Sequence, residues 1–553
     1  MDEAMRDISP PNADDTVDWW RGAVIYQIYL RSFRDTTGNG IGDLPGIIEK
    51  LDYLASLGVD AIWICPFYRS PMKDFSYDVS DHRAVDPTFG TLNDFDLLVD
   101  ETHARGLKIL IDLVIGHTSE QHAWFRESRR DRTNPQADWY VWADPNPDGT
   151  PPNNWLSVFG GPAWTWEPQR GQYYLHHFLP CQPHLDFHNP EVQDQFLEVA
   201  EFWLRCGVDG FRLDAVQAYF HDRDLRDDPP AAPGRQTPGV PAGNPYGLQR
   251  HVHSINRPES IGFFRRVRAL LDDHPGTAAV AEIFGNESPS VIADYTKGSD
   301  RLHMAYTFDL LSAPLSAAGI RAIVDAAGHG PGDGWPCWAF SNHDVQRAVS
   351  RLGGVRADND ALAKLLMALL LSLRGSACIY QGEELGLPQA ALNVDQLRDP
   401  YDRAFWPDVA GRDGGRTPMP WTAAAEHGGF SDTEPWLPVI AEHRARAVDR
   451  QDSDADSVLN AYRRFLAWRK NHPALRHGDI RFRNTEDPLL AFERRTPGER
   501  LVAVFNLDNE PRETALADLS DWRPIEGHGF FSERTNDVLR LPGFGAFFAT
   551  TRN

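Results

Sequence analysis

The chain has 553 residues, 41% of them hydrophobic, which is enough for a large core and excludes a chain disordered throughout. Its formal net charge of −24, spread along the sequence, repels nucleic-acid phosphates and anionic membranes and so argues against both as partners. The five cysteines form no CxxC pair, which argues against a disulfide framework and a zinc site and favours a reducing compartment.

The N-terminal stretch 1–18 is polar and acidic, without the basic and apolar parts of a signal segment. We expect it to be a disordered leader. No apolar run reaches 18 residues, the length that a membrane span needs. We therefore expect a cytoplasmic protein, either a monomer or a homodimer.

Short apolar runs alternate with amphipathic helical patterns from about residue 23 to residue 387. The eight runs are AVIYQIYL, DAIWIC, KILIDLVIG, GFRLDA, AAVAEIF, MAYTFDL, CWAFSN and SACIYQG. Alternating strands and helices indicate parallel βαβ units, and eight of them predict a closed (β/α)8 TIM barrel. An open, doubly wound sheet is the alternative, but no GxGxxG motif follows the first run.

Changes of pattern divide the chain. The segment between the third and fourth runs is rich in Trp, Pro, Asn and Gly and too long for a plain loop, so an inserted subdomain is expected at 118–188. Residues 226–247 are typical of a flexible loop after the fourth strand. Alternating apolar residues then predict an antiparallel β-sandwich domain at 478–553, leaving 19–117 and 189–477 for the barrel.

Charged side chains follow the predicted barrel strands, at the end where active sites of such barrels lie. They are Asp112 and His117 on the third strand, Arg212 and Asp214 on the fourth, Glu282 on the fifth, and His343 and Asp344 on the seventh. Singly, such an aspartate is often a helix N-cap and such a histidine structural. Arg212 and Asp214, however, share one face of an apolar strand, where a charge is costly unless paired or used. Several carboxylates at one barrel mouth suit glycoside hydrolysis.

Four segments resemble, in order, the signature regions of glycoside hydrolase family 13, the α-amylase family. They are DLVIGHTSE, GFRLDAV, AEIF and FSNHDVQR. IYQGEELG and GRDGGRTPMPW are similar to its α-glucosidase and oligo-1,6-glucosidase branch, and matching motifs run from about Trp19 to Trp421. The resemblance implies a TIM barrel carrying α-glucosidase activity.

The resemblance also implies roles for the matching carboxylates. Asp214 is the nucleophile that forms a β-glucosyl-enzyme, and Arg212 keeps it ionised and oriented. Glu282 is the general acid and then the base, and a neighbouring negative charge is expected to raise its pKa. Asp344 is the third carboxylate, which binds the 2- and 3-hydroxyls of the sugar.

The same resemblance implies a closed sugar pocket. Its residues are Asp74 and Tyr77 at the closed end, His117 and His343 on the glucose, Phe178 and Gln182 at the entrance, and Arg412 or, less plausibly, Arg416 as the partner of Asp74. A closed pocket admits only a non-reducing end. We therefore expect exo-acting removal of single glucose units, and not the endo action of an amylase.

Linkage preference depends on the residue after the nucleophile, Ala215. In the α-glucosidase and oligo-1,6-glucosidase branch, valine at this position is typical of α-1,6 enzymes and smaller residues are typical of α-1,4 enzymes. Such a difference in side-chain size changes the discrimination between substrates by about 1–3 kcal/mol. We expect action on maltose-like α-1,4 glucosides, with transfer to sugar or alcohol acceptors. An oligo-1,6-glucosidase, a sucrose-splitting enzyme and a glucosyltransferase or isomerase remain alternatives. An inactive binding relative is disfavoured because all three carboxylates are present.

One motif suggests a metal ion, although no cofactor is expected for the chemistry. The loop DTTGNGIGD offers side-chain oxygens from Asp35, Thr37, Asn39 and Asp43 and a carbonyl from Ile41. Alternating oxygens in a glycine-rich loop suit a structural calcium or magnesium ion, and related enzymes bind a divalent ion in a similar loop. A loop held only by Asx turns is the alternative.

Two departures from the family pattern stand out. Gly116 replaces the asparagine of the usual Asp-x-Val-x-Asn-His motif, which binds a structural calcium in amylases, so we expect that calcium site to be missing. QPHLDF, with His184 and Asp186, replaces the usual Gln-Pro-Asp-Leu-Asn, and the sequence offers no reason for this change.

Overall fold

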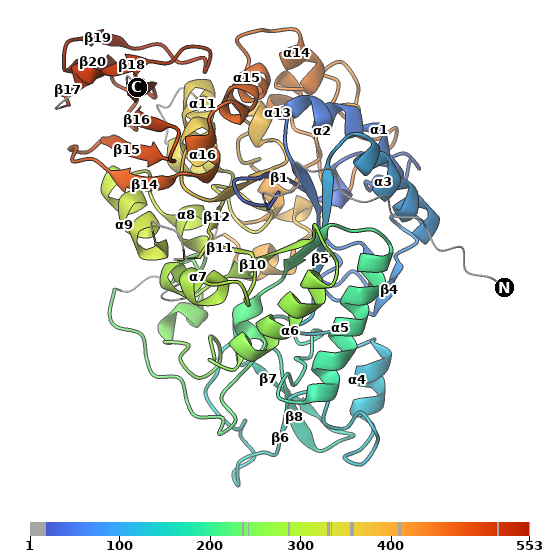
Figure 1. The fold of residues 1–553 in the computed structure, drawn as a ribbon. Coiled ribbons are helices and arrows are strands. Elements are labelled where there is room, and N and C mark those ends of the chain that lie inside the picture. The colour runs from blue at the N-terminus through green and yellow to red at the C-terminus, as the bar shows by residue number, and fades with distance from the viewer. Residues whose placement is uncertain are drawn as a thin grey trace.

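The computed structural model describes residues 18–234, 237–241, 243–285, 288–328, 332, 334–353, 359–407, 411–516 and 519–551. The expected leader at 1–18 lies outside the described residues, apart from Asp18. Eight parallel strands form the central sheet, in the order β11-β10-β9-β5-β2-β1-β13-β12. A parallel bridge between Ala305 and Pro336 joins the two ends and closes the sheet. The predicted TIM barrel is confirmed (Figure 1).

The barrel strands match the eight apolar runs, and helices surround them. The strands are β1 (Val24–Ile28), β2 (Ala61–Ile64), β5 (Lys108–Leu113), β9 (Gly210–Leu213), β10 (Ala278–Ile283), β11 (Met304–Thr307), β12 (Cys337–Trp338) and β13 (Ser376–Tyr380). The larger helices are α3 (Leu92–Ala104), α5 (Pro190–Arg205), α6 (Ser260–Asp272), α7 (Ser288–Thr296), α9 (Ala317–Ala327), α11 (Asn359–Leu370) and α15 (Val458–Lys470). Shorter ones are α1 (Leu44–Glu49), α2 (Leu51–Leu57), α8 (Phe308–Ser312), α10 (Ala348–Gly353), α12 (Pro400–Phe405), α13 (Ala441–Ala445), α14 (Val448–Asp452) and α16 (Pro473–His477).

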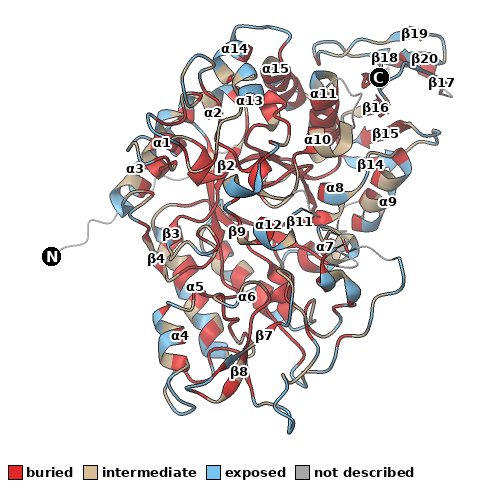
Figure 2. Ribbon diagram, turned by 180° about the vertical axis from the view of Figure 1, so that it is seen from behind, coloured by how far each residue is buried: buried red, intermediate tan, exposed pale blue. Residues whose placement is uncertain are grey.

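Strand alternation separates two apolar cores. One row of side chains, including Tyr26 and Ile28, packs outward against the helices. The other row, including Ile25, Leu110 and Val280, fills the barrel interior. Figure 2 shows the barrel strands buried along almost their whole length. The same inward row continues into polar residues toward the C-terminal ends of the strands, and these residues form the site described below.

The segment after β5 forms a small separate unit at the C-terminal end of the barrel (Figure 1). It holds α4 (Ala123–Ser128) and an antiparallel sheet of β6 (Trp142–Ala143), β8 (Gln172–Leu175) and β7 (Trp164–Glu167). Trp155 and Trp164 pack in its core. A short hairpin of β3 (Tyr68–Arg69) and β4 (Asp81–Val85) precedes it in the chain.

The C-terminal domain is an antiparallel sandwich, as predicted. Its five-stranded sheet contains β14 (Asp479–Phe482), β15 (Leu489–Arg495), β16 (Arg500–Asn506), β21 (Ala546–Thr551) and β18 (Trp522–Pro524). Its three-stranded sheet contains β17 (Arg512–Ala515), β20 (Val538–Leu541) and β19 (Glu533–Thr535). Side chains of both sheets, such as Val504 and Leu539, share one core. Within the described residues, no helix combines the length and apolar character needed to cross a bilayer.

Candidate active site

A buried arginine on β9 holds three carboxylates in place. Arg212 Nη1 donates to Asp112 Oδ1 at 2.8 Å and to Asp214 Oδ1 at 2.5 Å, and Nη2 pairs with Glu282. The guanidinium is fully buried and lies 5.0 Å from the centroid of the Trp63 ring. Removing any one of these partners would leave the other charges buried without a full counter-charge, which is costly. The network of ion pairs therefore fixes the position of each carboxylate.

Glu282 carries a proton at neutral pH. Burial raises its pKa to about 8; the charges of Asp214 and Asp344 add to the rise, and Arg212 opposes it. Tyr306 donates its hydroxyl to Oε1 at 2.9 Å, and the Ala215 N–H donates to Oε2 at 3.2 Å. The pKa of Glu282 is raised, as expected from the sequence, but burial contributes more to the rise than the neighbouring negative charges do.

Asp344 has the opposite electrostatic setting. Burial would raise its pKa, but His343, Arg412 and Arg416 together hold it well below the usual range. Arg412 Nη1 and Arg416 Nη2 each lie 3.0 Å from Oδ1. Both arginines also contact fully buried Asp399, at 2.8 and 2.5 Å. Asp344 therefore remains a carboxylate that accepts hydrogen bonds.

A stacked pair of rings lies beside these groups. Tyr77 and His343 are 5.3 Å apart at an interplanar angle of 9°. The Gln27 amide donates to His343 Nδ1 at 2.8 Å, so the ring proton is on Nε2, 2.6 Å from the Tyr77 hydroxyl. Tyr77 in turn donates to Asp112 Oδ2 at 3.1 Å. Burial lowers the pKa of His343 to about 3, so it is neutral.

The loop that carries Asp74 and Tyr77 is conformationally strained. Met72, Phe75 and Ser76 all have positive φ, between 47° and 87°, which non-glycine residues rarely adopt. Fully buried Asp78 offsets this strain by accepting the backbone N–H groups of residues 73 and 74 at 3.1 and 3.0 Å. Such strain persists only where the surroundings impose it, and here it places Asp74 against the pocket.

The closed end of the pocket forms around Asp74. Gln182, which was expected at the entrance, lies at this closed end instead: its Nε2 donates to Asp74 Oδ2 at 2.8 Å, and the side chain is buried. Arg412 Nη2 lies 3.7 Å from Asp74 Oδ1. His117 donates through Nε2 to the carbonyl of Tyr77 at 2.9 Å, and its ring lies 5.2 Å from that of Phe178. The inserted unit thus supplies one wall and the barrel loops the other.

These side chains line one cavity. Most of the residues named from the sequence lie on its surface: Asp74, Tyr77, His117, Phe178, Gln182, Asp214, Ala215, Glu282, Asp344 and Arg412. Arg212, His343 and Arg416 lie behind the wall and position it. Apolar side chains also line the cavity, namely Val158, Phe159, Phe178, Val240, Phe284 and Phe308.

Sequence reasoning missed several of these residues. Asp399 and Tyr306 hold other side chains of the site in place, but neither belongs to a motif identified in the sequence. Gln27 carried a usable signal, because it is a polar residue inside an apolar strand. The apolar lining gave no signal, because its members are far apart in the sequence and look like ordinary core residues. Val240 and its neighbours belong to the loop expected at 226–247, part of which lies outside the described residues.

The loop 35–43 has the composition of a cation site. Asp35 and Asp43 are 2% and 1% exposed, and among the described residues neither pairs with a lysine or arginine. Their oxygens accept N–H groups from Thr37, Gly40 and Thr36 at 2.8–2.9 Å, so Asx turns also hold the loop. Two buried carboxylates without a counter-charge fit a divalent cation bound to oxygen.

The structure places two departures from the family pattern, Gly116 and His184, next to each other. His117 and His184 are bridged as in an antiparallel sheet. A side chain at Gly116 would meet the rings of His184 and Tyr219, 3.4–3.6 Å from its Cβ. The imidazole of His184 therefore lies in van der Waals contact with the place that a side chain at residue 116 would take.

The chain is similar to known proteins along almost its whole length. The model of the alpha-amylase catalytic domain matches residues 27–478. A "Probable alpha-glucosidase" of Rhizobium meliloti (strain 1021) is 54% identical over 96% of this chain and 97% of its own. An "Oligo-1,6-glucosidase" of Heyndrickxia coagulans is 36% identical over 92% and 96%. The crystal structure of the alpha-glucosyl transfer enzyme XgtA has a TM-score of 0.95 at 54% identity, covering 97% of this chain and 100% of that one.

Proposed function

The chain belongs to the α-amylase family, glycoside hydrolase family 13, and on that premise we propose that it is a retaining, exo-acting α-glucosidase. It releases α-glucose from the non-reducing end of short α-1,4-linked glucosides and also transfers glucose to acceptors. One observation carries this proposal: Arg212 holds Asp214 and Glu282 on a single guanidinium at a closed sugar pocket.

The spacing of the two carboxylates supports retention of configuration. Both carboxylates contact the same guanidinium and so lie close together, as the roughly 5–5.5 Å separation of retaining enzymes requires. Inverting enzymes need about 6.5–9.5 Å, to admit a water molecule between the sugar and the base.

The protonation states fit the two steps of such a reaction. Protonated Glu282 gives its proton to the glycosidic oxygen while Asp214 attacks C1, so that the C1–O bond breaks and a glucosyl-Asp214 ester forms. Glu282, now a carboxylate, takes a proton from water or from an acceptor hydroxyl. That oxygen attacks C1 and releases Asp214. Asp344 binds ring hydroxyls throughout, because its neighbours keep it ionised.

The closed end of the pocket supports exo action. Arg412 spans Asp344, Asp399 and Asp74, so a glucan chain has no exit beyond the first sugar. The stacked pair of Tyr77 and His343 provides an aromatic face beside that sugar. A single glucose unit therefore fits, and a chain can enter only by its non-reducing end.

The apolar lining supports transfer beside hydrolysis. Phe159, Val240 and Phe308 line the pocket with side chains that bind water weakly and favour acceptors with an apolar body. Proteins similar to this chain include an alpha-glucosyl transfer enzyme at 54% identity. We propose that alcohols and sugars compete with water for the glucosyl-enzyme.

A second candidate concerns the linkage and the donor. Several relatives at 36% identity carry the name oligo-1,6-glucosidase, and a mutant of the trehalulose synthase MutB bound to sucrose is 33% identical with a TM-score of 0.87. Ala215 favours the α-1,4 assignment through a small difference in side-chain size. Isomaltose and sucrose are therefore the comparison donors in the test.

The test is a proton NMR time course of maltose hydrolysis. We expect new glucose to appear first as the α anomer, and the Asp214→Asn variant to lose roughly 10³-fold or more of kcat while keeping its circular dichroism spectrum. An excess of β-glucose beyond that from the reducing end of maltose would contradict retention. If isomaltose or sucrose were turned over faster than maltose, the assignment of the linkage would be overturned, but not the retaining mechanism.

We also propose that the loop 35–43 binds a structural calcium or magnesium ion. Asp35 and Asp43 would supply the charge, with Thr37, Asn39 and the Ile41 carbonyl as further oxygen ligands. The loop lies against the segment that carries Ser431, whose hydroxyl donates to Asp35 at 2.6 Å. The ion would stabilise this junction and take no part in the chemistry.

A further inference from the structure

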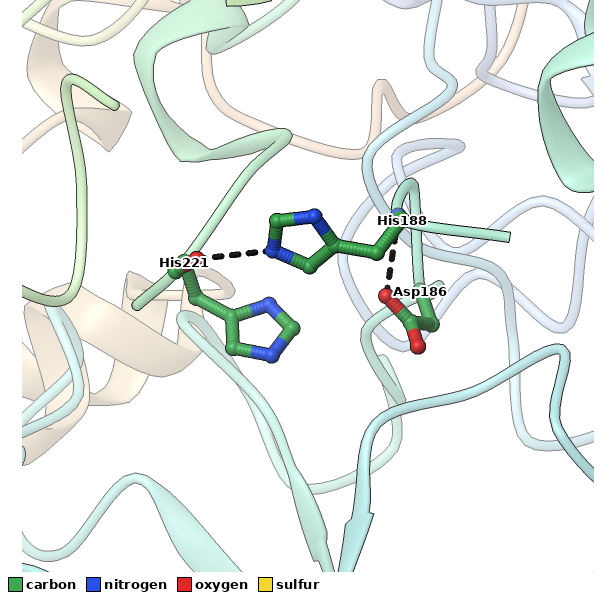
Figure 3. Close-up of side chains that lie close together, drawn as sticks. All are labelled: Asp186, His188 and His221. Carbon is green, nitrogen blue, oxygen red and sulfur yellow. Dashed lines mark hydrogen bonds between the residues drawn. The ribbon is translucent and has the colours of Figure 1, made fainter. Parts of the chain in front are cut away.

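Three side chains with metal-binding atoms lie together where the inserted unit rejoins the barrel. Asp186 and His188 precede α5, and His221 follows β9. One potential ligand atom from each lies within 4.8 Å of the others, and Figure 3 shows the three side chains side by side. None of them lines the sugar pocket. Within the described part of the chain, they form the one group of three such residues.

The hydrogen bonds leave donor atoms available in this group. His188 Nε2 donates to the backbone carbonyl of His221 at 2.8 Å, which leaves Nδ1 as the nitrogen with a lone pair when the ring is neutral. A metal-binding histidine commonly donates its other N–H to a backbone carbonyl in this way. Asp186 accepts the His188 N–H at 2.9 Å through Oδ1, and Oδ2 accepts no hydrogen bond from the described residues.

His221 supplies an independent indication of a ligand. Its side chain belongs to a residue only 5% exposed, and its buried Nδ1 has no hydrogen-bond partner among the described residues. A buried polar atom without a partner costs about 1–3 kcal/mol, so such atoms call for an explanation. The His221 ring lies 4.9 Å from that of His188.

We propose that Asp186, His188 and His221 bind a divalent transition-metal ion of the zinc class. Two imidazole nitrogens and one carboxylate oxygen suit zinc, nickel or cobalt and not calcium or magnesium, which prefer oxygen alone. The ion joins the end of the inserted unit to the loop after β9 and so acts as a structural clip. The cysteine count argued against a zinc site, but this site uses no cysteine.

The test is zinc titration of the full-length, untagged protein by isothermal titration calorimetry after dialysis against a chelator. Magnesium is present in excess, because it fills oxygen sites such as the loop 35–43 and does not compete for nitrogen ligands. We expect one zinc equivalent per chain. Absence of binding would overturn the proposal.

Variants separate this site from the other histidines, of which the chain has 20 in all. We expect Asp186→Asn and His221→Gln each to weaken zinc binding about 10-fold or more. Asp186→Asn keeps an oxygen for the His188 N–H and therefore provides the test if His221→Gln fails to fold. His427→Gln, a histidine elsewhere on the chain, is the control and should bind zinc as the parent does. Equal affinity in all variants would show that zinc binds elsewhere and would refute the site.

Discussion

The tyrosine that contacts the general acid gives the sharpest test of the electrostatic argument. Tyr306 donates its hydroxyl to Glu282 Oε1 at 2.9 Å, and both groups are buried. This hydrogen bond stabilises the charged form of Glu282 and so lowers its pKa. Tyr306→Phe removes the donor and leaves the ring. The pKa of Glu282 should therefore rise above its value of about 8.

The size of the shift follows from the energy of one hydrogen bond. A hydrogen bond to a charged group contributes about 1.5–3 kcal/mol, and 1.36 kcal/mol corresponds to about one pKa unit. Arg212 still pairs with Glu282 in the variant, so we expect the lower end, about one unit. Because the protonated form is the general acid, activity falls as pH rises through this pKa. The alkaline limb should move to higher pH.

The assay is kcat/KM for maltose between pH 5 and about 10, since this ratio reports the ionisations of the free enzyme. Tyr219→Phe is the matched control, because the Tyr219 hydroxyl is buried and has no hydrogen-bond partner among the described residues. Its alkaline limb should stay in place. A limb that is unmoved in Tyr306→Phe, or displaced to lower pH, would refute the assignment of the alkaline limb to Glu282.

Three further predictions concern other parts of the molecule. Arg412→Gln should raise KM for maltose about 10-fold or more, because it removes the guanidinium that pairs with Asp344 and its neighbouring carboxylates. An unchanged KM would argue against a closed end of the pocket. Ala215→Val should raise the ratio of isomaltose to maltose turnover, and an unaltered ratio of initial rates would remove Ala215 as a linkage determinant. The same variant should lower the free energy of unfolding, measured by urea denaturation, because φ is 45° there and a β-branched side chain tolerates that backbone less well than alanine does. Removing divalent ions with a chelator should lower the melting temperature of the parent protein, and magnesium or calcium should restore it. Neither ion should restore the melting temperature of Asp43→Asn. A melting temperature that does not change with chelator would mean that Asx turns alone hold the loop 35–43.

The sequence determined the architecture because the architecture depends on local pattern. Eight apolar runs separated by amphipathic segments admit few arrangements, and all eight became barrel strands. Strand alternation placed Arg212 and Asp214 on one face, and the structure shows that face turned into the barrel. The signature motifs named the three carboxylates because each motif is contiguous in the chain.

Only the tertiary structure decided how those carboxylates behave. The pKa of Glu282 depends on burial by several strands and on charges that lie up to 70 residues away in the sequence, and no local pattern records their sum. Asp399 acquires its role because a loop brings it against Arg412 and Arg416. The apolar pocket lining and the group of Asp186, His188 and His221 likewise unite distant segments. Sequence pattern sets the periodicity of each element, whereas electrostatics and site composition depend on which elements lie side by side after folding.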